Sequence, residues 1–206
     1  MDRFIALLAL VLIAWPASAR ELDRLLPALR EGGHVIVFRH VATDNRQSDV
    51  YPFKFDDMTA QRQLSDKGRE TAREIGTAMK RLGIPIGQIY TSRLNRAVET
   101  GKLLADSDLR SMDELTDSGA GSASAMAGSS GGRNAELGSV LLKLSTSAPK
   151  TGTNTILVTH KTNIVDGFGK DWGEVREGEA TIFRPQPSAK FPLVGRVQAS
   201  EWLEVR

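Results

Sequence analysis

The chain has 206 residues, of which 40% are hydrophobic and 25% charged; this fits one globular domain rather than a disordered chain or a protein with many membrane spans. The 27 Lys and Arg against 25 Asp and Glu give a net charge of +2 without a basic run, which argues against a nucleic-acid-binding protein. The sequence has no Cys, which excludes disulfides, thiolate metal sites and cysteine catalysis, and it has only three His.

The chain begins with a segment typical of export. Residues 4–15 form an unbroken apolar run of 12 residues, preceded by Arg3 and followed by Pro16-Ala17-Ser18-Ala19. A short apolar run that ends in small residues predicts a cleaved signal peptide over residues 1–19. The alternative is an uncleaved anchor, although crossing a bilayer takes about 20 apolar residues. We therefore expect a domain at residues 20–206 of a periplasmic or secreted protein, with no stable membrane insertion after cleavage.

The rest of the chain alternates helices with short buried strands. A helix is predicted where apolar residues recur three and four apart, and a buried strand where a short apolar run lies between turn residues. In chain order, the predicted elements are a helix at 21–30, a strand at 35–38, a helix at 66–82, a strand at 89–91, helices at 93–104 and 134–144, a strand at 155–158, a helix at 162–168, and strands at 180–183 and 194–197. This alternation predicts an α/β sandwich with a mixed sheet, whose last two strands are antiparallel at one side.

Turn and cap residues separate these elements. Gly32-Gly33 ends the first helix, and Ser65 and Ser92 can each cap the helix that follows. Residues 41–63 are polar and irregular. Residues 118–132 contain five Gly, five Ser, four Ala and one Met, a composition that predicts a flexible loop.

Side chains that can carry chemistry follow three of the predicted strands. His40 comes after the first strand, directly behind Arg39, and His160 comes after the third. The second strand leads into a helix with Arg93 and Arg96 near its start, where backbone N–H groups are free to bind an anion. Because ligands of open α/β sheets bind at the carboxyl ends of the strands, we expect these side chains at one edge. A dianion such as phosphate would relieve the repulsion among them and match the guanidinium geometry.

Each of these residues also has a structural interpretation. A single His after a strand is more often a structural hydrogen-bonding group, but its repetition at two strand ends favours a functional role. His34 opens the strand that His40 closes, about 20 Å away at about 3.3 Å per residue, and we interpret it as structural. Arg93 and Arg96 can form an exposed basic face, although the helix start favours a ligand-binding role for at least one of them.

Four ordered motifs resemble the histidine phosphatase (phosphoglycerate mutase-like) superfamily. They are Phe38-Arg39-His40-Val41-Ala42-Thr43, Leu64-Ser65-Asp66-Lys67-Gly68-Arg69, Tyr90-Thr91-Ser92-Arg93-Leu94-Asn95-Arg96-Ala97-Val98-Glu99-Thr100 and Leu157-Val158-Thr159-His160. Two late segments, at 178–185 and 195–197, are similar to those of small exported members. The resemblance extends over residues 33–205. It implies a three-layer α/β/α sandwich with a mostly parallel mixed sheet, and no metal or organic cofactor.

The resemblance also implies roles for individual residues. His40 matches the nucleophile of the family, while Arg39, Arg96 and His160 match the groups that bind the phosphate, and His160 also stabilises charge. Val41 stands where the family has Gly, which brings the tightness of that turn into question.

The leaving alcohol needs a proton, and the family takes it from a carboxyl group after the arginine-bearing helix. Glu114 is the first candidate for this acid and Asp113 the second, with Asp44 and Asp57 as further alternatives. Burial near the apolar strand ends is expected to raise the pKa of this carboxyl group.

The resemblance therefore implies an exported phosphomonoesterase, which hydrolyses a small-molecule or envelope-linked phosphate ester through a phosphohistidine intermediate. The chain lacks the long helical insertion of the larger acid phosphatases and phytases, and Lys161 stands where they have Asp after the second His. The alternative is a non-catalytic phosphate- or anion-binding or scaffold protein of the same fold. No nucleic-acid partner is expected, and the oligomeric state stays open.

Overall fold

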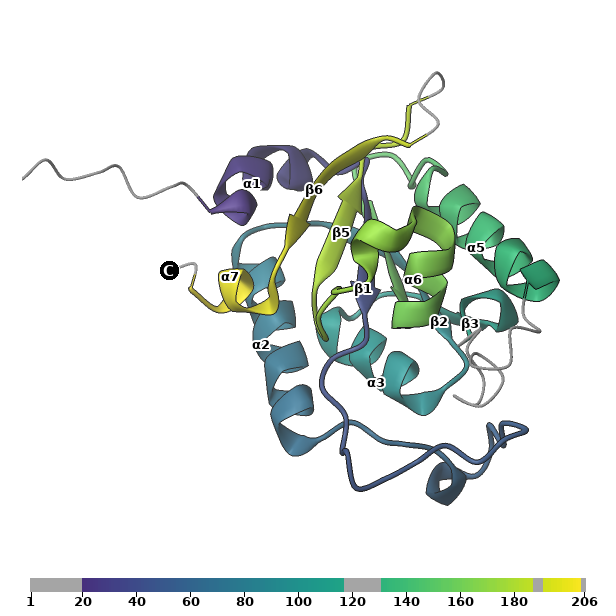
Figure 1. The fold of residues 1–206 in the computed structure, drawn as a ribbon. Coiled ribbons are helices and arrows are strands. Elements are labelled where there is room, and N and C mark those ends of the chain that lie inside the picture. Colours follow the sequence, from purple (N-terminus) through teal and green to yellow (C-terminus); the bar gives the residue numbers. More distant parts are fainter. Residues whose placement is uncertain (1–19, 117–130, 187–190, 205–206) are drawn as a thin grey trace, which may run out of the picture.

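The computed structural model describes residues 20–116, 131–186 and 191–204, which form one six-stranded sheet with helices around it (Figure 1). The predicted signal peptide and most of the predicted loop at 118–132 lie outside these residues. Within the described part of the chain, no helix is both long and apolar enough to cross a membrane.

Helices and strands alternate along the chain as the sequence predicts. The helices are α1 Glu21–Glu31, α2 Asp66–Arg81, α3 Asn95–Leu104, α5 Gly131–Ser145, α6 Lys161–Phe168 and α7 Ala199–Glu204. The strands are β1 Val35–Arg39, β2 Ile86–Ser92, β3 Leu109–Met112, β4 Asn154–Thr159, β5 Ala180–Phe183 and β6 Leu193–Val197. Short 3-10 helices are η1 Met58–Ala60, η2 Asp113–Leu115 and η3 Lys170–Trp172.

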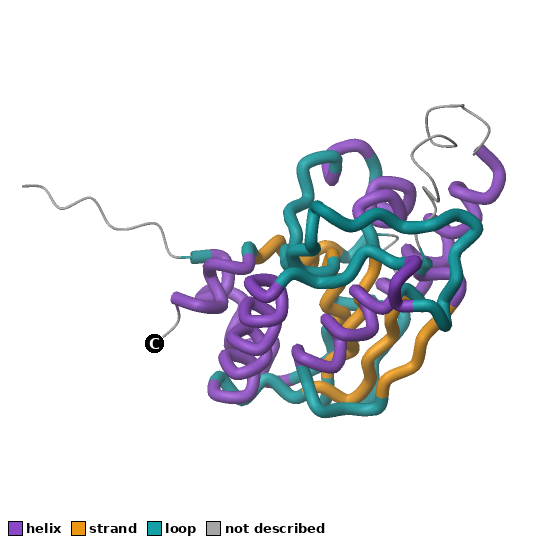
Figure 2. The backbone as a smooth tube through the Cα atoms, turned by 90° about the horizontal axis from the view of Figure 1, so that it is seen from below, coloured by secondary structure: helices purple, strands orange, loops and turns teal. Residues whose placement is uncertain are grey.

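The strand order in the sheet is β3-β2-β4-β1-β5-β6. The first four strands in this order run parallel, and Arg39 at the end of β1 is in register with Thr159 at the end of β4. Strands β5 and β6 are antiparallel to their neighbours, as the sequence predicts. The carboxyl ends of β1, β2 and β4 therefore meet at one edge, which Figure 2 shows from below with loops across it.

Helices cover both faces of the sheet, which gives the three layers. Ile36 and Phe38 of β1 pack in a core formed with α1, α2, α3 and α7, while Val35 and Val37 pack in a second core with α5 and α6. This alternation follows from the two-residue period of a strand. All residues of β4 are buried, as expected for a central parallel strand covered on both faces.

Five details differ from the sequence-based expectation. The sequence pattern does not predict β3 or α7, which have only 4 and 6 residues. Strand β2 begins earlier than predicted, at Ile86, and α5 already includes the last two residues of the predicted loop at 118–132. The prediction that Ser92 caps α3 is wrong. Leu94 is the N-cap, and Ser92 Oγ instead accepts the Leu94 N–H.

Candidate active site

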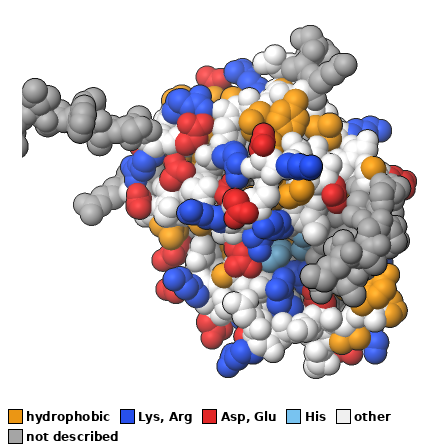
Figure 3. All heavy atoms as spheres, in the orientation of Figure 1, with side chains coloured by type: hydrophobic (Ala, Val, Ile, Leu, Met, Phe, Trp, Pro, Cys, Tyr) orange, Lys and Arg blue, Asp and Glu red, His pale blue; other side chains and the backbone are white. Residues whose placement is uncertain are grey.

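The ends of β1 and β4 place the two predicted histidines side by side. His40 follows β1 and His160 follows β4, and their ring centroids lie 5.2 Å apart with 59° between the ring planes. Each side chain is only 2% exposed. Figure 3 shows imidazole atoms between basic and acidic side chains on this face. His34 lies at the other end of β1, where its Nδ1 is 2.9 Å from the Gly32 carbonyl, in line with a structural role.

His40 is held as a neutral imidazole with a defined tautomer. Its Nδ1 lies 2.8 Å from the Val41 carbonyl oxygen, which can only accept, so Nδ1 carries the proton and Nε2 the lone pair. Burial lowers the pKa of His40 well below its usual value, and electrostatic interactions with His160 and then Arg96 lower it further, because they oppose a second positive charge. A neutral ring with its lone pair on Nε2 is the form of histidine that attacks phosphorus.

His160 is positioned by a serine at the end of β2. Its Nε2 lies 2.8 Å from Ser92 Oγ, which also accepts the N–H of Leu94. The other ring nitrogen, Nδ1, is buried and has no hydrogen-bond partner among the described residues. Burial and then the charges of Arg96 and Arg62 lower the pKa of His160 well below its usual value. A buried ring nitrogen without a protein partner can accept or donate a hydrogen bond to a ligand.

Two arginines complete the predicted set. Arg96 lies in the first turn of α3 with its side chain fully buried, and its Nη1 donates to Asp49 Oδ1 at 2.9 Å. Arg39 ends β1, and its Nη1 donates to the Val175 carbonyl at 2.9 Å while its Nη2 lies 3.4 Å from Glu177. The charges of both arginines act on both imidazoles. Two guanidiniums beside two neutral imidazoles form a suitable site for a dianion such as phosphate.

Three charged residues of this region are not predicted by the sequence. Asp49 contacts Arg96 and also accepts the backbone N–H of Arg62 at 2.9 Å. The guanidinium of Arg62 is close enough to lower the pKa of His160. Glu177 lies against Arg39. All three belong to irregular segments without periodicity, so only their charge marks them in the sequence.

The candidate acids differ in their surroundings. Glu114 and Asp113 lie in η2, where the Glu114 side chain is exposed, so the expectation of a buried acid is wrong for Glu114. Asp113 Oδ1 accepts a hydrogen bond from exposed Arg93 at 3.0 Å. A side-chain hydrogen bond from the neighbouring arginine lowers the pKa of Asp44 to about 2, and one from a threonine lowers the pKa of Asp57. A lowered pKa disfavours both as proton donors near neutral pH.

The turn after His40 accepts Val41 without strain. No described residue other than Gly has a positive φ, and the Val41 side chain is buried in a small apolar cluster. Glycines on other segments provide the room. A Cβ on Gly68 would collide with the Ala42 carbonyl, and the N–H of Gly178 reaches the His40 carbonyl at 3.1 Å. The glycine that the family has at this position is therefore not needed for this turn.

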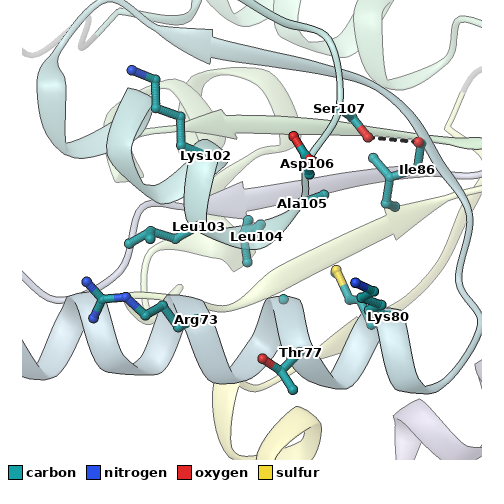
Figure 4. Close-up of a pocket in the computed structure, with 12 residues that line it drawn as sticks. Arg73, Thr77, Lys80, Ile86, Lys102, Leu103, Leu104, Ala105, Asp106 and Ser107 are labelled. Atoms are coloured by element: carbon teal, nitrogen blue, oxygen red, sulfur yellow. Dashed lines mark hydrogen bonds between the residues drawn. The ribbon is translucent and has the colours of Figure 1, made fainter.

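A cavity of about 680 Å³ lies between α2 and α3, with Arg73, Lys80 and Lys102 in its lining (Figure 4). It reaches Ile86 at the start of β2, whereas the histidines lie beyond the end of that strand, about 20 Å away at about 3.3 Å per residue. None of the candidate site residues lines this cavity, so we do not assign it to the site. Among the described residues, no three His, Asp or Glu side chains are grouped to hold a metal ion.

Comparison with known proteins tests the family resemblance. The sequence model of the histidine phosphatase superfamily (branch 1) matches residues 35–134, a span that includes Arg39, His40 and Arg96. This match supports the resemblance of residues 35–134 to the histidine phosphatase superfamily. No curated protein sequence matches this chain.

Solved structures show the same fold at low sequence identity. A protein described as an alpha-ribazole-5'-P phosphatase, from Escherichia coli, is 15% identical with a TM-score of 0.56, and the alignment covers 82% of this chain and 97% of that one. Phosphoserine phosphatase from Entamoeba histolytica is 17% identical with a TM-score of 0.51, covering 82% and 98%. The protein histidine phosphatase SixA in complex with tungstate is 14% identical with a TM-score of 0.51, covering 82% and 98%. These similarities show the three-layer α/β/α fold of the phosphoglycerate mutase-like histidine phosphatases.

Proposed function

We propose that this protein is an exported phosphomonoesterase of the histidine phosphatase superfamily, which hydrolyses a small-molecule or envelope-linked phosphate ester through a phosphohistidine intermediate. One observation carries the proposal. His40, neutral and with its lone pair on Nε2, lies beside a second neutral imidazole and within reach of two arginine charges. A nucleophile among fixed positive charges suits transfer of a phosphoryl group.

In the first step, His40 Nε2 attacks phosphorus, and the bond from phosphorus to the ester oxygen breaks. Arg39 and Arg96 stabilise the charge on the equatorial oxygens. His160 offers its Nδ1, which has no partner among the described residues, to one of these oxygens. Glu114 donates the proton that the leaving alkoxide needs.

In the second step, water attacks the phosphohistidine, and the carboxylate left by the first step accepts a proton from that water. The bond from phosphorus to nitrogen breaks, orthophosphate leaves, and His40 returns to its neutral form. The two steps together consume one water and regenerate every protein group.

The competing function is a non-catalytic anion-binding protein of the same fold. One observation favours it: Glu114, the first candidate for the acid, is exposed. A binding protein would hold phosphate without forming a covalent bond to His40. Covalent labelling therefore separates the two functions.

The deciding experiment measures phosphate release from p-nitrophenyl phosphate by the chain 20–206, together with acid-labile phosphate on the protein. His40→Ala is expected to lower turnover by more than roughly 10³-fold and to abolish the label, because it removes the nucleophile. His34→Ala is the matched control, since it removes a buried histidine from the other end of the same strand. Full turnover in His40→Ala would refute the proposed function.

The export part of the proposal has its own test. N-terminal sequencing of the protein secreted from cells is expected to start at Arg20, because the small residues before it are typical of a cleavage site. A mature protein that keeps Met1 would support the uncleaved anchor instead.

A further inference from the structure

Three aromatic side chains line up along the segment between β1 and α2. The ring centroids of Tyr51 and Phe53 lie 5.9 Å apart, and those of Phe53 and Phe55 lie 6.0 Å apart. The guanidinium of Arg93 lies 4.0 Å from the centroid of the Phe55 ring. We call these four side chains the aromatic strip.

Both ends of the aromatic strip are close along the chain to residues of the candidate site. Arg93 directly follows Ser92, whose hydroxyl contacts the second imidazole. At the other end, Tyr51 lies two positions after Asp49, which accepts a hydrogen bond from Arg96. Each end of the strip is therefore linked along the chain, within two positions, to a residue that contacts a member of the candidate site.

Apolar side chains are exposed to solvent on this same segment. Tyr51 is 63% exposed, and its neighbour Val50 and Met58 of η1 are 45% and 47% exposed. These are three of the six large hydrophobic side chains that are exposed in the described part of the chain. Exposed apolar side chains that gather beside a binding site favour contact with an apolar part of a ligand.

A buried glutamine fixes the aromatic strip against α3. Gln61 is 2% exposed, and its Nε2 donates to the carbonyls of Lys54 and Phe55 at 3.0 and 2.9 Å. Its Oε1 accepts the N–H of Asn95, the first residue of α3, at 2.9 Å. Because the segment is already held in place, a ligand that binds to it does not have to order it first.

We propose that the aromatic strip binds the leaving group of the phosphate ester, so that the protein prefers monoesters of aromatic or other apolar alcohols to those of small polar alcohols. The proposal rests on the proposed function for the position of the phosphate. An in-line attack by His40 sends the alcohol out on the side of phosphorus away from the ring. In this proposal the aromatic strip is the surface that an apolar leaving group contacts, and a small polar alcohol cannot use it.

The test compares kcat/KM for 1-naphthyl phosphate and glycerol 3-phosphate in the chain 20–206. Tyr51→Ser is expected to lower the ratio of the two values by about tenfold, since it removes one large exposed ring from the strip. Leu203→Ser is the matched control, because Leu203 is also an exposed apolar side chain, 43% exposed, but lies on α7. The control is expected to leave the ratio unchanged. An unchanged ratio in Tyr51→Ser would overturn the proposal.

A second measurement separates this proposal from the proposed function. If the protein hydrolyses neither ester, the proposed function fails, and calorimetric titration with 1-naphthyl phosphate and with inorganic phosphate decides the role of the strip. Tighter binding of 1-naphthyl phosphate that Tyr51→Ser removes would support the strip without turnover. Equal binding of the two compounds would overturn it.

Discussion

Arg93 and Arg96 lie three positions apart in the sequence but have opposite surroundings. The Arg96 side chain is fully buried, whereas that of Arg93 is 41% exposed and paired with Asp113. Arg39→Ala or Arg96→Ala is therefore expected to weaken vanadate binding by about 10- to 100-fold, since each charged hydrogen bond contributes about 1.5–3 kcal/mol. Arg93→Ala serves as the control and is expected to change it by less than about threefold, because an exposed ion pair contributes little. Vanadate inhibition constants measure both effects, and a larger loss in Arg93→Ala would contradict the assignment.

The acid can be tested with esters that differ in their leaving groups. Glu114→Gln keeps the shape of the side chain but cannot donate a proton. It is expected to slow phosphorylation of His40 by alkyl phosphates by about 10²-fold or more, the range of general acid catalysis. With p-nitrophenyl phosphate the slowing should be much smaller, because nitrophenolate leaves without a proton. Single-turnover rates measure this step apart from the attack of water.

Two further variants identify the acid if Glu114 is not the donor. Equal slowing with both esters in Glu114→Gln would remove Glu114 from this role. Asp113→Asn then tests the other carboxyl group of η2. Glu177→Gln tests the carboxylate that lies against Arg39, which the sequence does not mark.

At the scale of the elements, the turn after β1 shows that a packed Val41 can stand where the family has Gly. Val41 is fully buried and packs with Leu64 and Ala72. Val41→Gly is expected to lower the free energy of unfolding by about 2–4 kcal/mol, from lost apolar burial and the added flexibility of Gly. Urea denaturation measures this loss, while kcat/KM at a temperature where the variant is folded should stay within about threefold of wild type. A variant as stable as wild type would show that Val41 contributes nothing to the turn.

The sequence predicts the helices and strands that have a strong periodicity of apolar residues or a clear capping residue. The predicted helix at 66–82 and its cap at Ser65 agree with the structure. The Ser65 side chain accepts the Gly68 N–H, and the apolar side chains that recur along one side of α2 are buried. Strand β3 is not predicted, since it has only 4 residues and is partly exposed along its length. The start of α3 is misplaced because Ser92 bonds to Leu94 and His160 instead of capping the helix.

The candidate site likewise contains residues that the sequence predicts and residues that it does not. Arg39, His40 and His160 follow from their places at strand ends, which the parallel sheet brings together. Arg62 and Asp49 reach the site through the irregular segment after β1, and their positions depend on hydrogen bonds such as that from the Arg62 N–H to Asp49. No local pattern encodes such contacts, so a single sequence does not predict them.

For the molecule as a whole, the burial of neutral histidines is expected to lower the free energy of unfolding at acidic pH. Burial lowers the pKa of His40, His160 and His34 below the value of about 6.5 that histidines have in an unfolded chain. As the pH falls below about 6.5, the unfolded chain takes up protons that the folded chain does not. The free energy of unfolding must therefore fall with the pH in this range. The neutral form of His40 and the expected sensitivity of the fold to acid have the same cause.

The stability of the protein is accordingly expected to fall between pH 7 and pH 5, by up to about 1.4 kcal/mol per pH unit for each of the three histidines. Carboxylates such as Asp44, whose pKa is lowered to about 2, lose their contribution only as the pH falls below the value of about 4 of the unfolded chain, so they do not act in this range. Urea denaturation at pH 7, 6 and 5 measures the slope. The double variant His40→Asn, His160→Asn should retain only the slope from His34, whatever its stability at pH 7. A wild-type free energy of unfolding that stays constant from pH 7 to pH 5 would show that the buried imidazoles take up protons as readily as exposed ones.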